Sequence, residues 1–229
     1  MRNIHAIMLA VPAVLVGQAN EKPTIEQILD KHYSAMGGLE KLIEVKTTRA
    51  TFKMQGGPVS VLGVIESRQP GSVRAEAEIM GQKKIEMINE DGGWDLSYSK
   101  PTAMSKKDVD EGRFTINLFV SPFVNYSEKG SKVEYVGTAD RGKTYKVRLT
   151  TAGGNKILYF IDISSYLIAR VESSDTNARF SNYKMVSGIN VPHEFEEPTP
   201  GAPGSMKITL QKMEINPVID DSRFESPKK

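Results

Sequence analysis

The chain has 229 residues, of which 39% are hydrophobic and 25% are charged, as in a soluble globular protein large enough to bury a core. Its 30 basic and 28 acidic residues leave a net charge of +2, so the composition carries no electrostatic signature of nucleic-acid binding. Cysteine is absent, which excludes disulfides, thiolate metal sites, cysteine nucleophiles and lipidation on cysteine.

Residues 1–19 have the layout of a secretory signal peptide. Arg2 precedes an apolar run at residues 6–16, and Gly17 and Ala19 place small residues at the two positions that a signal peptidase reads. The run is too short to span a bilayer as a helix. We therefore expect cleavage after Ala19, a periplasmic location and one domain over residues 20–229. Because no cysteine follows, we expect no lipid anchor.

A helix is predicted over residues 24–36. Thr24 is a good N-cap, and Gln27 three residues later completes a capping box. The pair Gly37-Gly38 is a typical helix end, and residues 39–44 can add one further turn. The apolar residues of this segment recur at helical spacing and form one stripe: Ile25, Ile28, Leu29, His32, Tyr33 and Met36.

After this helix the hydrophobic period changes to two. Ala50, Phe52 and Met54 alternate with polar residues, and residues 73–79, 84–87 and 145–150 alternate in the same way. One dry face and one wet face per strand is typical of an antiparallel sheet solvated on one side. Further strands are expected near residues 59–66, 94–98, 132–136, 156–161, 167–172, 178–185, 192–196 and 206–215.

Residues 105–125 interrupt the strands. Charged residues at 106–111 are followed by an apolar group that includes Leu118, Phe119 and Phe123. We predict short helices or a long loop here, and loops of this length inside compact domains are usually functional or lids.

About a dozen antiparallel strands must curl or split into two sheets. We predict a mainly β protein with few helices, in which a curved antiparallel sheet forms an open half-barrel. The N-terminal helix and the central segment 105–125 would cover it, the latter as a lid.

Two features that could indicate chemistry have structural explanations. Residues 137–144 read GTADRGKT and match the phosphate-loop pattern, but a period-two strand follows them, whereas that motif requires a helix. His32 and His193 are the histidines of the mature chain, and neither lies in the context of a hydrolase nucleophile. We predict no catalytic residue, no metal site and no cofactor.

Several short motifs follow one another through most of residues 24–229: Glu66-Ser67-Arg68-Gln69-Pro70, Asp91-Gly92-Gly93-Trp94, Tyr159-Phe160-Ile161-Asp162, Gly188-Ile189-Asn190-Val191-Pro192 and Asn216-Pro217. Their order resembles the LolA/LolB-like family of periplasmic lipoprotein-sorting carriers, especially its uncharacterised bacterial branch. The resemblance implies a half-barrel with helices at its mouth and an apolar cavity for lipid. It also implies that a strand-end arginine, matched by Arg68 with one residue inserted before the proline, holds the lid closed by bonding to lid backbone.

We therefore predict a non-catalytic periplasmic carrier for lipid or lipoprotein acyl chains. Such a carrier could take part in sorting lipoproteins to the outer membrane. Its further partners would be membrane-bound donor and acceptor proteins, and we expect no nucleic-acid partner. Two alternatives stay open: an envelope interaction module that docks through the same sheet, and a hydrolase whose polar residues converge in the fold. Strand parity and the lid assign the cavity lining to Phe52, Met54, Ile79, Met87, Trp94, Leu96, Leu118, Phe119 and Phe123.

Overall fold

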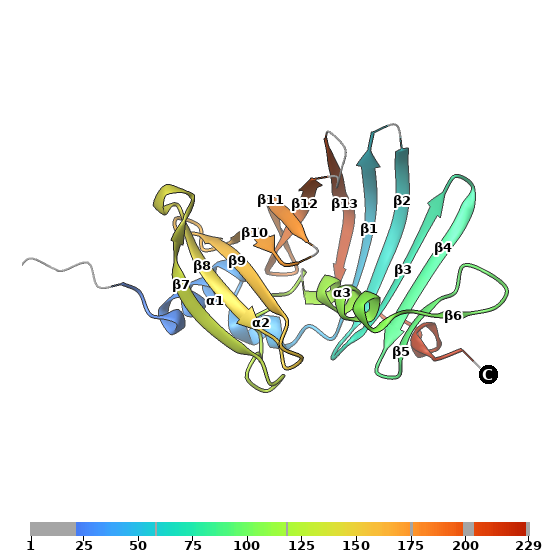
Figure 1. Cartoon of the computed structure of the whole chain (residues 1–229), viewed down its shortest axis with the longest axis horizontal. Coiled ribbons are helices and arrows are strands. Elements are labelled where there is room, and N and C mark those ends of the chain that lie inside the picture. The colour runs from blue at the N-terminus through green and yellow to red at the C-terminus, as the bar shows by residue number, and fades with distance from the viewer. Residues whose placement is uncertain (1–21, 58, 118, 175, 199–203, 228–229) are drawn as a thin grey trace, which may run out of the picture.

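The computed structural model describes residues 22–227, apart from residues 58, 118, 175 and 199–203 (Figure 1). The predicted signal peptide, residues 1–19, and its cleavage site lie outside the described residues. The helices are α1 (Ile25–Met36), α2 (Leu39–Ile43) and α3 (Lys106–Asn117), with 3₁₀ turns η1 (Asp140–Gly142) and η2 (Asp221–Phe224). The strands are β1 (Thr47–Gly56), β2 (Val59–Arg68), β3 (Ser72–Ile79), β4 (Gln82–Asn89), β5 (Gly92–Asp95), β6 (Thr102–Ala103), β7 (Lys132–Ala139), β8 (Thr144–Thr150), β9 (Lys156–Asp162), β10 (Ile168–Glu172), β11 (Asn177–Val186), β12 (Ile189–Pro198) and β13 (Ser205–Ile215).

Helix α1 forms where the capping pattern predicts it. The Thr24 hydroxyl accepts from the Gln27 backbone N–H at 3.3 Å, and the Gln27 side chain accepts from the Thr24 N–H at 3.0 Å. The helix ends at Gly37, whose φ of 118° lies in the region that favours glycine. Five residues of the predicted stripe are buried: Ile28, Leu29, His32, Tyr33 and Met36.

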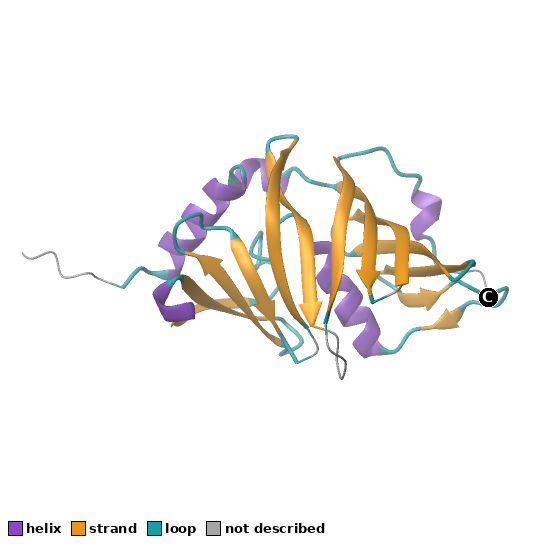
Figure 2. Ribbon diagram, turned by 90° about the horizontal axis from the view of Figure 1, so that it is seen from above, coloured by secondary structure: helices purple, strands orange, loops and turns teal. Residues whose placement is uncertain are grey.

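All thirteen strands of the described chain belong to one sheet, in the order β6-β5-β4-β3-β2-β1-β13-β12-β11-β10-β9-β8-β7. Every neighbouring pair of these strands is antiparallel, and β1 beside β13 joins the first strand to the last in the middle of the sheet. The edges β6 and β7 do not pair, so the curved sheet stays open (Figures 1 and 2). The predicted open antiparallel sheet is confirmed.

Cross-strand registers sort residues onto two faces. One row runs Ala50, Ile65, Ala75, Glu86 and Asp95, and we call this face, on which α3 packs, the inner face. Its contact with α3 is close, since Val73 and Ile88 pack against Val109 of the helix. The neighbouring row lies on the opposite, outer face: Arg49, Glu66, Arg74, Met87 and Trp94.

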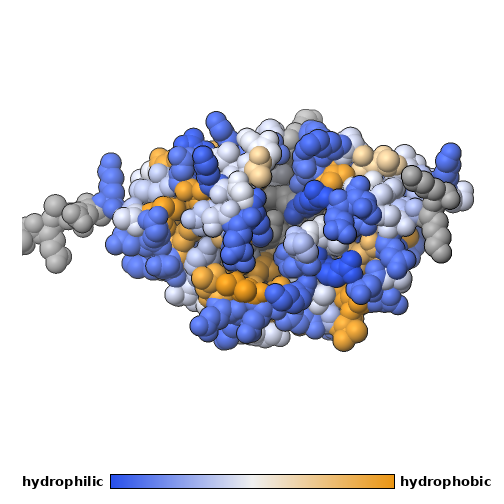
Figure 3. Space-filling model, turned by 90° about the horizontal axis from the view of Figure 1, so that it is seen from below, coloured by the Kyte–Doolittle hydropathy of each residue, from blue (hydrophilic) through white to orange (hydrophobic). Residues whose placement is uncertain are grey.

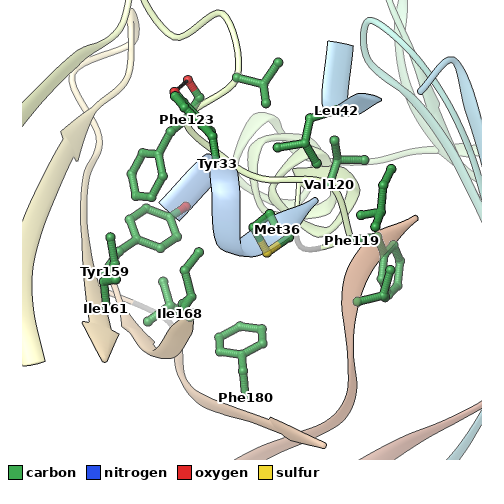
Figure 4. Close-up of a cluster of buried hydrophobic side chains, with 14 of the residues drawn as sticks. Tyr33, Met36, Leu42, Phe119, Val120, Phe123, Tyr159, Ile161, Ile168 and Phe180 are labelled. Carbon is green, nitrogen blue, oxygen red and sulfur yellow. Dashed lines mark hydrogen bonds between the residues drawn. The ribbon is translucent and has the colours of Figure 1, made fainter. Parts of the chain in front are cut away.

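The main hydrophobic core lies between α1, the segment after α3 and β7–β13 (Figure 4). Tyr33 from α1 donates its hydroxyl to the Phe123 carbonyl at 2.8 Å, and the Phe123 ring meets the Tyr159 ring edge-on at 5.0 Å. A second, much smaller cluster of buried residues lies under α3: Val73, Ile88 and Val109. Among the described side chains of α3, Val109 is the one that belongs to this cluster.

The central segment contains one regular helix of 12 residues, α3, where the sequence pattern left short helices or a loop. Ser105 and Asp108 form its N-terminal cap: the Asp108 N–H donates to the Ser105 hydroxyl at 3.2 Å, and the Ser105 N–H donates to the Asp108 carboxylate at 3.3 Å. This reciprocal pair is the acidic form of a capping box and could have located the helix start. An ion pair between Lys106 and Asp110 at 2.6 Å supports the first turns.

The C-terminal segment packs on the outer face through charged side chains. The buried Glu66 carboxylate binds Arg49 at 2.7 Å and also binds Arg223 of η2. Arg223 also forms an ion pair with Glu76 at 2.7 Å. The neighbouring Phe224 packs against the same face, and only 2% of its surface is exposed. Both faces of β2–β4 are therefore partly covered, the inner face by α3 and the outer face by η2.

The region that matches the phosphate-loop pattern is a hairpin connection. η1 occupies residues 140–142 and strand β8 begins at Thr144, so no helix N-terminus faces this loop. Among the residues that the structure describes, no helix is long and apolar enough to span a membrane. The face seen from below in Figure 3 is mostly hydrophilic, with hydrophobic residues gathered in small patches.

Candidate functional site

A groove of about 650 Å³ lies between α3, the β5–β6 end of the sheet and strands β11–β13. Its floor is apolar and comes from the inner face of three neighbouring strands. Phe180, Phe195 and Ile208 stand opposite one another in register, so their side chains form a row across β11, β12 and β13. The volume falls within the range of about 300–1,000 Å³ that is usual for small-molecule sites.

Aromatic rings make the floor continuous with the segment after α3. Phe119 meets Phe195 edge-on at 6.0 Å, and Phe180 meets Phe195 at 5.3 Å with an interplanar angle of 79°. Figure 4 shows Phe119 and Phe180 at one side of the core cluster. Phe119 thus belongs both to the core and to the wall of the groove.

Carboxylates line the remaining wall. Glu86 and Asp95 come from the inner face of β4 and β5, Asp108 from α3, and Glu197 from β12. Lys84 binds Asp95 at 3.1 Å, and hydrogen bonds from the Ser97 hydroxyl and backbone N–H hold the pKa of Asp95 below its ordinary value. In the described residues, no cluster of three or more His, Asp or Glu side chains has a geometry that could hold a metal ion.

No protein-family model matches this chain, and no curated protein sequence matches it. Its structure is similar to a DUF1329 family protein from Desulfovibrio piger, with a TM-score of 0.57, 12% identity and coverage of 85% of this chain and 95% of that one. It is similar to a putative outer membrane lipoprotein-sorting protein domain from Vibrio parahaemolyticus, with a TM-score of 0.54, 13% identity and coverage of 86% and 94%. A LolA superfamily protein from Nitrosomonas europaea gives a TM-score of 0.53, 12% identity and coverage of 90% and 99%. The chain has a LolA-like fold.

One of the predicted cavity residues lines the groove, and three others lie on the same inner face of the sheet. Phe119 lines it directly. Phe52 and Met54 lie on the inner face of β1, opposite Leu210 and Ile208, which line the groove. Ile79 follows the same parity as the inner-face residues of β3, at the end of that strand. Leu118 lies outside the described residues.

Other predicted cavity residues lie elsewhere. Met87 stands opposite Arg74 and Trp94, which puts both apolar side chains on the outer face, and Leu96 follows two residues after Trp94 with the same parity. The prediction assumed that the apolar side of β4 and β5 faces inward, but η2 covers the outer face and the inner positions are Glu86 and Asp95. Phe123 is fully buried against Tyr159, away from the groove.

Sequence reasoning missed the residues that form most of the floor: Phe180, Phe195, Met206, Ile208 and Leu210. Their strands were predicted, and the period-two pattern places Phe180 with Ala178 and Ile208 with Leu210 on common faces. What the pattern lacks is the pairing of β13 with β1, which brings these faces beside the predicted Phe52 and Met54.

Arg68 has partners on the outer face. Its guanidinium binds Asp221 and lies over the Phe224 ring at 4.9 Å, so its visible contacts hold the C-terminal segment. Its role as a lid latch stays a prediction. α3, the helix of the predicted lid, packs on the inner face of the sheet, opposite to these contacts of Arg68.

Replacing Arg68 by alanine separates these two roles. We expect the C-terminal segment to become more sensitive to carboxypeptidase, at a stability cost of about 1 kcal/mol, since exposed ion pairs and cation–π contacts each contribute little. The off-rate of a bound fluorescent fatty acid should stay within twofold of the wild-type value. A large acceleration of release with an unchanged C-terminal segment would instead support the latch.

Proposed function

We propose that the protein is a periplasmic carrier that binds a lipid or lipoprotein acyl chain in the groove between α3 and β11–β13. The observation that supports this most is the apolar floor of a groove of about 650 Å³ in a LolA-like sheet. Two of the similar structures are described as a lipoprotein-sorting protein domain and a LolA superfamily protein. Export by the predicted signal peptide would place the chain between two membranes, where a carrier has its donor and acceptor proteins.

The energetics suit reversible binding. Burying an acyl chain stabilises the complex by about 0.8 kcal/mol per CH₂, so ten methylenes contribute about 8 kcal/mol before ordering costs. Release requires that one wall can move. α3 forms one wall of the groove, and its Val109 packs on Val73 and Ile88 of the sheet. In this proposal α3 is the gate and no covalent chemistry takes place.

Filling the groove tests the proposal. Ala178 is half-buried and lines the groove, so Ala178→Phe should occupy the space that an acyl chain needs. We expect at least tenfold weaker binding of a fluorescent fatty acid to the delipidated protein, with an unchanged melting temperature. Leu62→Phe, at an exposed position of β2, is the matched control and should bind like the wild type.

The same experiment addresses the interaction-module alternative. A module that docks through its sheet surface would show no saturable probe binding even before the substitution. Mass spectrometry of the protein purified under native conditions provides a second measurement, since a carrier should retain lipid and Ala178→Phe should retain less. Wild-type protein that neither binds the probe nor carries lipid would contradict the proposal.

A further inference from the structure

We infer that the groove selects amphiphiles whose polar end is cationic, such as an amine, over those with an anionic end. This rests on the proposed function, and it assigns the ligand class of the same site. Four carboxylates line the groove, and none of the lining residues that the structure describes is lysine, arginine or histidine.

The carboxylates come from three separate walls. Glu86 and Asp95 project from the sheet, Asp108 from α3 and Glu197 from β12, so they face one space from different elements. Lys84 binds Asp95, and the Ser105 hydroxyl donates to Asp108 at 2.7 Å. Glu197 accepts the backbone N–H of Asn177 at 3.2 Å.

Two of these carboxylates are paired unfavourably in the sheet itself. Glu86 stands directly opposite Asp95 in the β4–β5 register, and like charges at such positions destabilise a sheet. Lys84 relieves the repulsion from one side at 3.1 Å. A cationic group entering the groove would relieve it from the other, whereas a carboxylate or phosphate would add to it.

Helix α3 separates acidic from basic surroundings. Ser105, Asp108 and Gly112 face the groove, while Lys106, Asp110 and Arg113 line a different cavity next to β8 and β9. Within each set the residues are three or four positions apart, so each set lies along one side of the helix. Lys106 and Arg113 of the helix therefore line a cavity other than the groove, and the apolar floor of the groove strengthens the field of the carboxylates.

The inference gives the ligand an orientation. The chain would lie on the floor formed by Phe180, Phe195 and Ile208, and its cationic end would lie toward Glu86 and Glu197. An acyl chain by itself would use the floor alone. The charged walls thus supply selectivity, while the floor supplies most of the affinity.

The test compares three amphiphiles with the same chain: dodecylammonium, dodecanol and dodecanoate. Each displaces the uncharged probe N-phenyl-1-naphthylamine from the full mature chain at low salt and below its aggregation concentration. We expect dodecylammonium to bind at least tenfold more tightly than dodecanoate. The double variant Glu86→Gln/Glu197→Gln should reduce this ratio below threefold and leave dodecanol unchanged. Asp95 and Asp108 are kept, since they bind Lys84 and cap α3.

A matched control changes the net charge equally without touching the groove. Glu40 and Glu128 are exposed and do not line it, so Glu40→Gln/Glu128→Gln should keep the wild-type ratio. A ratio that falls equally in both double variants, or equal affinities for all three amphiphiles in the wild type, would overturn the charge inference and leave the carrier proposal standing. Failure of the probe and all three amphiphiles to bind would overturn both.

Discussion

Replacing Gly37 by alanine should lower the free energy of unfolding by about 3 kcal/mol or more. Gly37 ends helix α1 with a φ of 118°, a conformation that L side chains rarely adopt. A Cβ at this position would lie 2.1 Å from the backbone carbonyl oxygen of Gly188, in the turn between β11 and β12. Because the obstacle is backbone and not the end of a flexible side chain, α1 and this turn would have to separate.

The neighbouring glycine isolates the contribution of this contact. Gly38 has a φ of 104°, but a Cβ there would meet nothing within 4 Å. Gly38→Ala should therefore cost the conformational strain alone, about 1–3 kcal/mol. Urea unfolding of both variants measures the difference. Equal losses would show that the approach of α1 to Gly188 contributes nothing to stability.

Acid should weaken the protein through His32 between pH 6.5 and pH 4. Burial lowers the pKa of His32 to about 4, although the hydrogen bond to the Tyr166 carbonyl acts in the opposite direction. A carbonyl oxygen can only accept a hydrogen bond, so Nδ1 of His32 carries the hydrogen and donates it to the Tyr166 carbonyl, with 2.8 Å between nitrogen and oxygen. Nε2 then accepts a hydrogen bond from the Ser121 hydroxyl at 3.1 Å. A proton on Nε2 would put an uncompensated charge inside the core.

The sign follows from proton binding. Between pH 6.5 and pH 4 the unfolded chain binds a proton at this histidine and the folded chain does not, so stability falls as the pH falls. We expect a loss of about 2 kcal/mol from this group between pH 7 and pH 5. The loss should be complete near the folded pKa of about 4.

The measurement is the free energy of unfolding as a function of pH, in the wild type and in a His32 variant. His32→Gln should remove most of the pH dependence of stability between pH 7 and pH 5. Burial acts to raise the pKa of Glu76, but hydrogen bonds from Lys83 and Arg74, with the charges of Arg74 and Arg223, outweigh it and lower the pKa to about 2. Stability from Glu76 is therefore lost below about pH 4.5, outside the window used for His32. An unchanged slope in His32→Gln would contradict the assignment.

The same histidine connects stability to the groove. Ser121 follows directly on the segment that carries Phe119, and Phe119 contributes to the groove wall. Loosening of this segment in acid should weaken binding of the fluorescent fatty acid before the sheet unfolds. Comparing the two pH profiles would show whether the segment after α3 opens separately from the core.

Much of the architecture could be predicted from local pattern. The Thr24–Gln27 capping box, the glycines at the end of α1 and the period-two runs each depend on residues within a few positions of one another, and the structure has them as expected. The strand after Thr144 likewise excluded a phosphate loop without coordinates.

Much of the candidate groove depended on information that local pattern does not contain. Alternation tells which side chains of a strand share a face, but not which face is inward when both are covered. On β4 the pattern favoured Met87, yet the C-terminal segment buries the outer face and the groove receives Glu86.

The sequence by itself determined the N-terminal helix, most of the strands and their antiparallel class, because those follow from short-range periodicity and turn chemistry. Only the tertiary structure decided that β13 pairs with β1, that η2 covers the outer face and that three walls bring carboxylates to an apolar floor. The physical reason is that the first two of these arrangements join residues more than a hundred positions apart, and that all three depend on packing between elements and not on the local pattern of any one of them.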